Sequence, residues 1–367
     1  MTVTVESAGL KALLRDARVL VCAGSGGVGK TTTAAAAALA AARLGRRVVV
    51  VTIDPAQRLA DAIGMTLSHE PTLVAGITPG ELWAVMLDTR ATFDALVGRY
   101  AGDAVQVDRI LANRFYRNIS ASLSGTQEYM AAEKLYDLHN DARFDLVVVD
   151  TPPTRNALDF LDAPARLVRF LDHRLYRVLV APTRIGMRVA NVAAQAFLKT
   201  ISKLVGGEAI ADAIAFFQAF DGMEEGFRRR ADAVMELLRS TATGYVIVTS
   251  PRREAVEEAV YFADRLRDQH LQVSAVVANR LHPVFAPELT DDEVADEAAR
   301  RCGTPLGALW GNLDVIRRMA RSERAALVPL LERAGATTAL ASVPLLGQDV
   351  HDLDGLDQVA THLVTAG

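Results

Sequence analysis

Short apolar runs, separated by segments of helical spacing, dominate the hydrophobic pattern of this chain. The runs are rich in β-branched residues and continuous rather than alternating, which is typical of parallel strands covered on both faces. They occupy residues 18–23, 48–53, 82–87, 146–149, 245–248, 273–278 and 339–343. The pattern predicts an α/β fold built on a doubly wound, mostly parallel sheet.

Two long stretches, 91–142 and 165–240, interrupt this rhythm because they lack strand-like runs and place apolar residues at helical spacing. The second stretch carries three apolar stripes: Val189, Val192, Ala196 and Leu204; Ile210, Ile214, Phe217 and Phe220; and Phe227, Ala231, Val234 and Leu238. We therefore predict a single domain over residues 1–367, with one helical subdomain inserted as about 91–142 and 165–240.

The composition suits a globular protein and excludes several functions. Of 367 residues, 50% are hydrophobic and 23% are charged, so a sizeable core is available. The net charge of −4 argues against nucleic acid as the main partner, because phosphate binding needs a basic surface. Two cysteines, Cys22 and Cys302, exclude a disulfide framework. The seven histidines never fall at metal-ligand spacing, so we expect no zinc site.

No secretory or membrane-spanning segment is recognisable in the sequence. Residues 1–20 mix acidic and basic side chains without an apolar centre. The longest apolar run, 34–42, is too short to span a bilayer, and we interpret it as a buried helix. We expect a cytoplasmic protein without stable membrane insertion.

The strongest chemical signal is the segment 24–32, which matches the pattern G-x-x-x-x-G-K-[ST] between an apolar strand and an Ala-rich helix. Glycines let backbone N–H groups turn inward to cradle phosphates, and the helix N-terminus adds a positive dipole end. We expect Lys30 to reach the β- and γ-phosphates and the Thr31 hydroxyl to bind Mg²⁺. The predicted ATP-binding residues are Gly24, Gly26, Gly27, Val28, Gly29, Lys30, Thr31 and Thr32.

Two carboxylates follow predicted strands. Asp150 ends an apolar strand, as expected of the Walker B residue that holds Mg²⁺ through water. Asp54, directly after the second strand, lies where a carboxylate would position or deprotonate the attacking water. A purely structural Asp54-Pro55 turn explains the same residues equally well.

These motifs together resemble the ArsA-type ATPases, a family that includes arsenite-pump ATPases and the ATPases of guided entry of tail-anchored proteins. The resemblance rests on the glycine-dense loop, on residues 52–56, and on residues 150–154 followed by Leu158, Phe160 and Leu161, and it covers nearly the whole chain. Residues 276–280 resemble the family's adenine-recognising strand end, with Asn279 as the base contact. Residues 343–346, including Pro344, resemble the late loop that closes over the adenine.

The resemblance implies a P-loop protein of the dimeric branch that has a deviant Walker A motif. Such dimers close when two ATP molecules bind and open after hydrolysis. Asp54 then belongs to switch I and aligns the attacking water. Residues 150–156 form switch II, which passes the nucleotide state to the helical subdomain, and that subdomain holds a protein client.

The chain departs from the family pattern at three places. Ser25 stands where members usually carry a signature lysine that reaches the partner's nucleotide, and Arg58 or Arg155 would have to replace its charge. The zinc-binding Cys-x-x-Cys is missing. The cysteine cluster that binds arsenite is also missing, which argues against metalloid activation because that needs soft thiolate ligands.

Two functions remain in competition. The chain is either an ATPase whose hydrolysis drives a client cycle, or a nucleotide-gated scaffold with little turnover that works with a catalytic paralogue. The dimer is correspondingly a homodimer or a heterodimer with a lysine-bearing paralogue. A membrane-positioning ATPase is disfavoured because residues 351–367 are acidic rather than basic. We interpret Phe216, Phe217, Phe220 and Phe227 as core packing of the insert rather than as a client groove.

Overall fold

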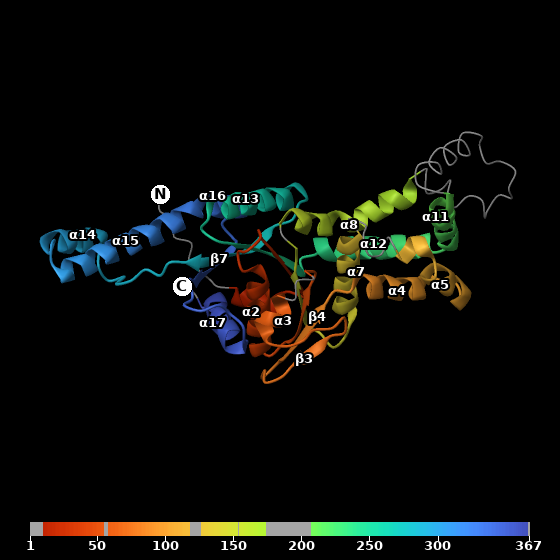
Figure 1. Cartoon of the computed structure of the whole chain (residues 1–367), viewed down its shortest axis with the longest axis horizontal. Helices are drawn as coiled ribbons and strands as arrows, with labels where there is room; N and C mark the ends of the chain where they lie inside the picture. Colours follow the sequence, from red (N-terminus) through yellow and green to blue (C-terminus); the bar gives the residue numbers. More distant parts are fainter. Residues whose placement is uncertain (1–9, 55–57, 118–125, 153, 174–206, 366–367) are drawn as a thin grey trace. The chain divides into compact units, whose positions relative to one another are not determined.

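The computed structural model describes residues 10–54, 58–117, 126–152, 154–173 and 207–365 (Figure 1). The chain forms two compact units. The sheet unit comprises Met1–Met86, Asp141–Ala157 and Thr241–Gly367, and the helical unit comprises Leu87–Asn140 and Leu158–Ser240. The first predicted helical stripe, Val189 to Leu204, lies outside the described residues.

The sheet unit is built on one eight-stranded sheet in the order β3-β4-β2-β5-β1-β6-β7-β8. The strands are β1 (Val19–Ala23), β2 (Arg47–Thr52), β3 (Thr72–Val74), β4 (Glu81–Met86), β5 (Leu146–Asp150), β6 (Thr243–Thr249), β7 (Val273–Leu281) and β8 (Ala339–Pro344). All neighbours pair in parallel except β3, which runs antiparallel to β4 at the sheet edge. The predicted α/β fold with a mostly parallel sheet is confirmed, and β3 is the strand that the apolar runs did not predict.

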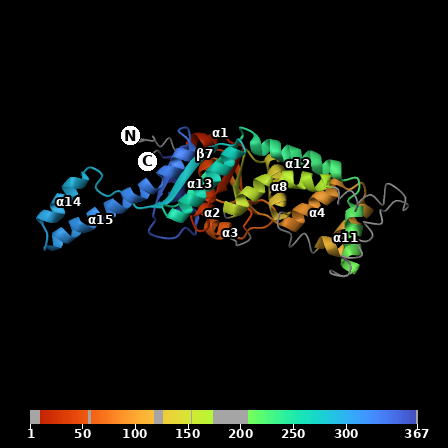
Figure 2. The ribbon, with the colours of Figure 1, turned by 90° about the horizontal axis from the view of Figure 1, so that it is seen from above.

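Helices cover both faces of this sheet (Figures 1 and 2). The helices of the sheet unit are α1 (Lys11–Asp16), α2 (Lys30–Arg43), α3 (Arg58–Ile63), α13 (Arg253–Asp268), α14 (Asp291–Arg300), α15 (Pro305–Ala326), α16 (Val328–Ala334) and α17 (Leu353–Val364). From β1 through α2 to β2 the chain moves one way across the sheet, and from β6 through α13 to β7 it moves the other way. Right-handed crossovers therefore place α2 and α13 on opposite faces.

Helix α2 is the central helix of its face. It packs with α1, α17 and the strands in one cluster of buried side chains, and residues 34–42 are buried throughout, as the apolar run predicted. Because nearly all of these side chains are alanine, the helix backbone lies close to the sheet. Its first turn, beginning at Lys30, is thereby fixed against the carboxyl ends of the central strands.

An ion pair joins the amino ends of β2 and β5. The Asp145 carboxylate accepts hydrogen bonds from the Arg47 backbone N–H at 2.9 Å and from the Arg47 guanidinium at 2.7 and 3.2 Å. This contact with Arg47 holds the pKa of Asp145 below its ordinary value. Both side chains are partly exposed to solvent.

The helical unit has a core of its own. It contains α4 (Thr89–Tyr100), α5 (Ala104–Leu111), α7 (Thr126–Asn140), α11 (Gly207–Ala219) and α12 (Glu224–Arg239). The predicted stripe on α12, from Phe227 to Leu238, is buried along its length. Phe220 packs between Phe216 and Phe227, with ring centroids 4.9 and 5.4 Å away. These rings are core residues of this unit, as interpreted above.

One helix, α8 (Thr154–Asp172), begins in residues of the sheet unit and continues into residues of the helical unit. It follows β5 after a short turn that contains Thr151. The chain therefore runs from the metal-site strand predicted above into the helical unit without another strand in between.

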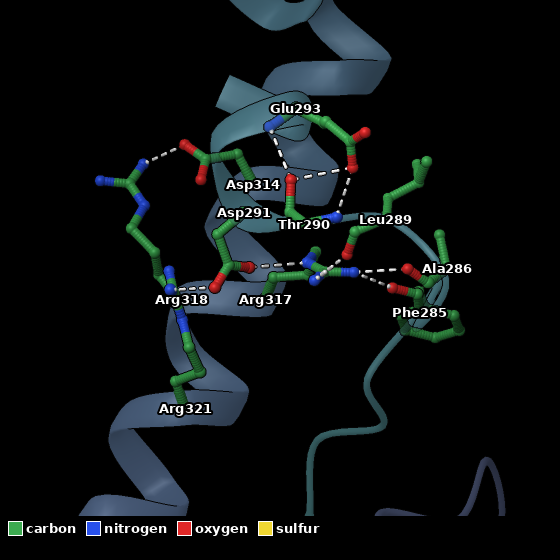
Figure 3. Close-up of polar contacts among 10 residues, drawn as sticks. All are labelled: Phe285, Ala286, Leu289, Thr290, Asp291, Glu293, Asp314, Arg317, Arg318 and Arg321. Atoms are coloured by element: carbon green, nitrogen blue, oxygen red, sulfur yellow. Dashed lines mark hydrogen bonds and ion pairs between the residues drawn. The ribbon is translucent and has the colours of Figure 1, made fainter. Parts of the chain in front are cut away.

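A hairpin of α14 and α15, which the hydrophobic pattern did not predict, follows β7. Its hub is the buried guanidinium of Arg317 (Figure 3). This group donates to Asp291 Oδ1 at 2.9 Å and to the carbonyls of Phe285, Ala286 and Leu289 at 2.9, 2.5 and 2.7 Å. The Arg317 side chain thus holds the loop that precedes α14 through three of its backbone carbonyls.

Candidate functional site

The glycine loop lies between the end of β1 and the start of α2, at the centre of the sheet. Gly27 and Gly29 have φ angles of +77° and +87°, which glycine adopts at no steric cost. A Cβ on Gly24 would lie 2.2 Å from the carbonyl oxygen of Val248 in β6. Two special backbone angles and one close approach therefore account for the glycines at these positions.

A cleft of about 870 Å³ opens beside this loop. Its walls are the loop, helix α3, Arg280 and the residues 349–351 after β8. Of the predicted ATP-binding residues, it is lined by Gly27, Gly29, Lys30, Thr31 and Thr32. The volume is within the range of small-molecule and cofactor sites in proteins.

Lys30 and Asp150 form a buried pair next to the cleft. Lys30 Nζ lies 4.0 Å from Asp150 Oδ1, and their side chains are 8% and 0% exposed. Burial raises the pKa of Asp150 above its ordinary value, and this outweighs the opposing effects of Lys30 and of the Thr31 and Thr52 hydroxyls. Among the described residues, Asp150 Oδ1 has no hydrogen-bond partner.

That orphaned oxygen tests whether the site suits a magnesium ion. A buried acceptor without a donor is costly unless a ligand completes it. Oxygen atoms of carboxylates and hydroxyls are the ligands that Mg²⁺ prefers, and it usually keeps several waters. Asp150 and the adjacent Thr31 supply this donor set, so the residues present fit the ion that the loop motif predicts.

The segment that follows β2 is bonded to the same carboxylate. Thr52 and Asp150 are register partners in β2 and β5. The Thr52 hydroxyl donates to Asp150 Oδ2 at 3.1 Å and accepts the backbone N–H of Asp54 at 3.2 Å. The Asp54 side chain is about one-fifth exposed, and its Oδ2 lies 3.8 Å from the Arg58 guanidinium.

The end of β7 contacts the glycine loop directly. Asn279 Nδ2 donates to the carbonyl of Val28 at 2.8 Å, and the Arg280 guanidinium donates to the carbonyl of Gly27 at 3.0 Å. Arg280 has a φ of +62°, an unusual angle for a side chain of this size. The sequence motifs indicated Asn279 but not Arg280, although a charged residue directly after Asn279 at a strand end was an available signal.

Pro344 is placed differently from the other predicted residues. It ends β8 as the register partner of Leu281, and the next residue, Leu345, donates its N–H to the Leu281 carbonyl at 2.9 Å. Five residues further on, Val350 and its neighbours line the cleft. The structure thus brings the loop after Pro344 to the site, with Pro344 itself anchored in the sheet.

Three cations line the cleft in the part of the chain that the structure describes: Lys30, Arg58 and Arg280. Ser25, where the resemblance implies a lysine in other family members, is buried and also lines the cleft. The Arg155 side chain lies outside the described residues. Of the two arginines proposed to replace the lysine charge, the structure places Arg58 at the cleft.

The two cysteines differ in their surroundings. Burial raises the pKa of the Cys22 thiol far above its ordinary value, which keeps it protonated, and Cys302 is exposed. Across the described residues, no three side chains of His, Cys, Asp or Glu gather closely enough to hold a metal ion. None of the helices described is long and apolar enough to cross a bilayer.

The sheet order, the glycine loop and its buried helix define a P-loop protein of the α/β class. Sequence comparison makes the assignment specific, because the profile of the anion-transporting ATPase family matches residues 17–298. The chain belongs to this family, and the resemblance to ArsA-type ATPases is confirmed.

Curated relatives agree with this assignment. The chain is 36% identical over 152 residues to a Babesia bovis protein named "ATPase ASNA1 homolog", covering 41% of this chain and 40% of the relative. It is 32% identical over 157 residues to "ATPase get3" of Aspergillus terreus, covering 42% and 45%. A Dictyostelium discoideum "ATPase ASNA1 homolog" is 34% identical over 144 residues, covering 39% and 41%. The matches span less than half the length of these relatives.

Proposed function

We propose that this protein binds ATP together with Mg²⁺ and hydrolyses it. The observation that carries the proposal is the buried Lys30–Asp150 pair beside the glycine-loop cleft, with one carboxylate oxygen left without a donor. A lysine and a carboxylate in this arrangement match the phosphate-binding and metal-binding parts of P-loop hydrolases. Family membership and relatives named as ATPases support the same reaction.

Each residue has a proposed role. The loop N–H groups and Lys30 bind the β- and γ-phosphates, and Thr31 with Asp150 would hold the magnesium ion. When bound, the ion neutralises negative charge on the phosphate oxygens. Asp54 positions the attacking water, since its backbone is bonded through Thr52 to the Asp150 carboxylate, which pairs with Lys30. Asn279 and the loop after Pro344 are the proposed contacts of the base.

We further propose that the nucleotide state controls a client-binding helical unit in a dimer. Residues 150–156 lead from β5 into α8, and α8 continues into the helical unit, so a displacement of this segment has a continuous helix along which to act. The dimer, the client and the choice between a homodimer and a heterodimer with a lysine-bearing paralogue are parts of this proposal.

One observation favours the competing function of a nucleotide-gated scaffold. Ser25 lines the cleft at the position where the family's lysine would supply charge to the partner's nucleotide. A serine carries no charge, so hydrolysis by the isolated chain would lack this contribution. The scaffold function predicts ATP binding with almost no turnover.

Two variants test the ATPase proposal. Lys30→Ala should weaken ATP binding by about 10- to 100-fold, because it removes charge-assisted hydrogen bonds of about 1.5–3 kcal/mol. Asp54→Asn should still bind ATP but stall its cleavage. Calorimetry measures the affinity and single-turnover assays measure the cleavage rate. Lys11→Ala, at an exposed lysine of α1, is the matched control and should bind normally.

Three outcomes would decide against parts of this assignment. Unchanged ATP affinity in Lys30→Ala would remove the phosphate site. Cleavage at the wild-type rate in Asp54→Asn would reduce Asp54 to a turn residue. Tight binding without cleavage in the wild-type protein, with or without a paralogue, would favour the scaffold.

A further inference from the structure

Thr52 links the carboxylate of Asp150 to the backbone of Asp54 in the proposed site. It is the last residue of β2, its side chain is 1% exposed, and it is the register partner of Asp150. Its hydroxyl makes two hydrogen bonds, one to Asp150 Oδ2 at 3.1 Å and one from the Asp54 N–H at 3.2 Å. One buried oxygen atom therefore contacts both the metal-site strand and switch I.

The chemistry of the groups fixes the direction of both bonds. A hydroxyl has one hydrogen to donate and lone pairs that accept. The Asp54 backbone N–H can only donate, so the hydroxyl must accept from it. An ionised Asp150 can only accept, so the single hydroxyl hydrogen points at Oδ2. With Asp150 ionised, neither bond can reverse, and the Asp54 N–H, the Thr52 hydroxyl and Asp150 Oδ2 form a directed chain.

We propose that Thr52 is a positioning residue for ATP hydrolysis, which holds the backbone of Asp54 in a fixed position relative to Asp150. The inference rests on the proposed ATPase function and extends it to a residue that does not line the cleft. Partners behind a metal-binding carboxylate commonly set its orientation, and their loss costs about 10- to 100-fold in metal affinity or activity. Here the same hydroxyl also holds the segment that bears the water-positioning group.

Packing alone does not account for this residue. Valine has the same branched shape as threonine and is equally suited to a strand, so Thr52→Val keeps the packing and removes only the oxygen. The substitution leaves the Asp54 N–H and Asp150 Oδ2 each without this partner. Thr52→Ser keeps the oxygen and loses a methyl group. Together, Thr52→Val and Thr52→Ser separate the effect of the hydroxyl group from the effect of the side-chain shape.

The matched control is Thr338→Val. The Thr338 hydroxyl, next to the amino end of β8, is also buried, and its one hydrogen is shared between the carbonyls of Ala334 at 2.8 Å and Val273 at 3.1 Å. Its removal should lower stability without altering the site. A loss of activity that stems only from general destabilisation would appear in this variant too.

The first measurement is made on the nucleotide-free protein. Amide hydrogen exchange at Asp54, read by mass spectrometry, should be at least about 5-fold faster in Thr52→Val, the factor that corresponds to a hydrogen bond of about 1 kcal/mol. It should be unchanged in Thr52→Ser and Thr338→Val. Equal exchange in the wild type and Thr52→Val would overturn the link to switch I, whatever the protein hydrolyses.

The second measurement is single-turnover cleavage at saturating ATP and Mg²⁺. Thr52→Val should be slower by about 10-fold or more while its ATP affinity stays within about 3-fold, and Thr52→Ser should recover most of the rate. In an Asp54→Asn background, Thr52→Val should add almost nothing, because both changes act through the same group. The assay is then repeated at a Mg²⁺ concentration far above the one that saturates the wild type. If Thr52→Val then cleaves ATP at the wild-type rate, Thr52 acts only through the metal-binding carboxylate, and the proposal is overturned.

The two hypotheses fail in different ways. If the wild-type protein binds ATP but never cleaves it, the ATPase function fails and the exchange measurement still decides the hydrogen-bond link. If the wild type cleaves ATP and Thr52→Val matches it, only the role of Thr52 fails.

Discussion

Gly29→Ala perturbs the glycine loop at one atom, and its cost can be worked out from the structure. Gly29 has a φ of +87°, and alanine in the left-handed region costs about 1–2 kcal/mol. A Cβ at this position would lie 2.2 Å from Asn279 Nδ2. Asn279 must therefore rotate away and lose its 2.8 Å bond to the Val28 carbonyl, a further loss of about 1 kcal/mol. The sum is about 2–3 kcal/mol.

The assay is urea denaturation followed by tryptophan fluorescence. Both tryptophans of the chain, Trp83 and Trp310, belong to the sheet unit, so the signal reports on the unit that holds the loop. ATP affinity, measured alongside, should also fall because the displaced Asn279 is a proposed base contact.

The control is Gly26→Ala. A Cβ on Gly26 meets no atom within 4 Å, and its φ lies outside the left-handed range. This variant should unfold within about 0.5 kcal/mol of the wild type. If Gly29→Ala unfolds with the same free energy as Gly26→Ala, the argument from the φ angle and the Asn279 contact is refuted.

Two further predictions concern charge. In the proposed dimer, Ser25→Lys should raise the rate of single-turnover cleavage, because the lysine would supply a cation to the nucleotide of the partner. An unchanged rate in Ser25→Lys, together with a sharp loss of rate in Arg58→Ala or Arg280→Ala, would show that these arginines already supply the charge. Asp145→Asn should lower the free energy of unfolding near neutral pH by at most about 1 kcal/mol, since its pair with Arg47 is partly exposed. The folded-state pKa of Asp145 is depressed, so its contribution is present above the unfolded-state pKa and is lost as pH falls through the folded one. Urea titrations of both proteins should therefore show a difference in the free energy of unfolding near neutral pH and no difference in strong acid. The same difference at both pH values would contradict this.

The buried strands were predictable because a parallel sheet covered on both faces produces continuous apolar runs. All seven predicted strands are present, with ends that shift by a few residues. Strand β3 escaped because it has three residues at the sheet edge, and Leu73 at its centre is 49% exposed. An edge strand with little to bury leaves no run to detect.

The α14–α15 hairpin escaped for a different reason. Periodicity detects helices that bury an apolar stripe, but α14 buries only Val294, and α15 buries Gly307, Arg317 and Ala320. The contacts that organise the hairpin are polar, and the sequence alone does not distinguish the buried Arg317 at their centre from an exposed arginine.

In the candidate site, the sequence motifs predicted the residues that belong to one continuous segment of strand, loop or helix. The glycine loop, Lys30 and Asp150 lie where consecutive strand, loop and helix must place them. Arg280 contacts the Gly27 carbonyl from 253 residues away in the sequence. The motif at residues 276–280 indicated Asn279, and it did not indicate that the next side chain would also bond to the loop. The assignment of roles to these residues remains a prediction.

Helix α2 has a consequence for how this chain can change over evolutionary time. From Ala34 to Ala42 every residue is alanine except Leu39, and all are buried. Other buried helices drift by exchanging one bulky side chain for another and repacking around it. Here every exchange of an alanine other than to glycine adds atoms to a buried contact, and a displaced helix would carry Lys30 and Thr31 with it. Residues 34–42 should therefore be among the segments of this chain that change most slowly between related proteins.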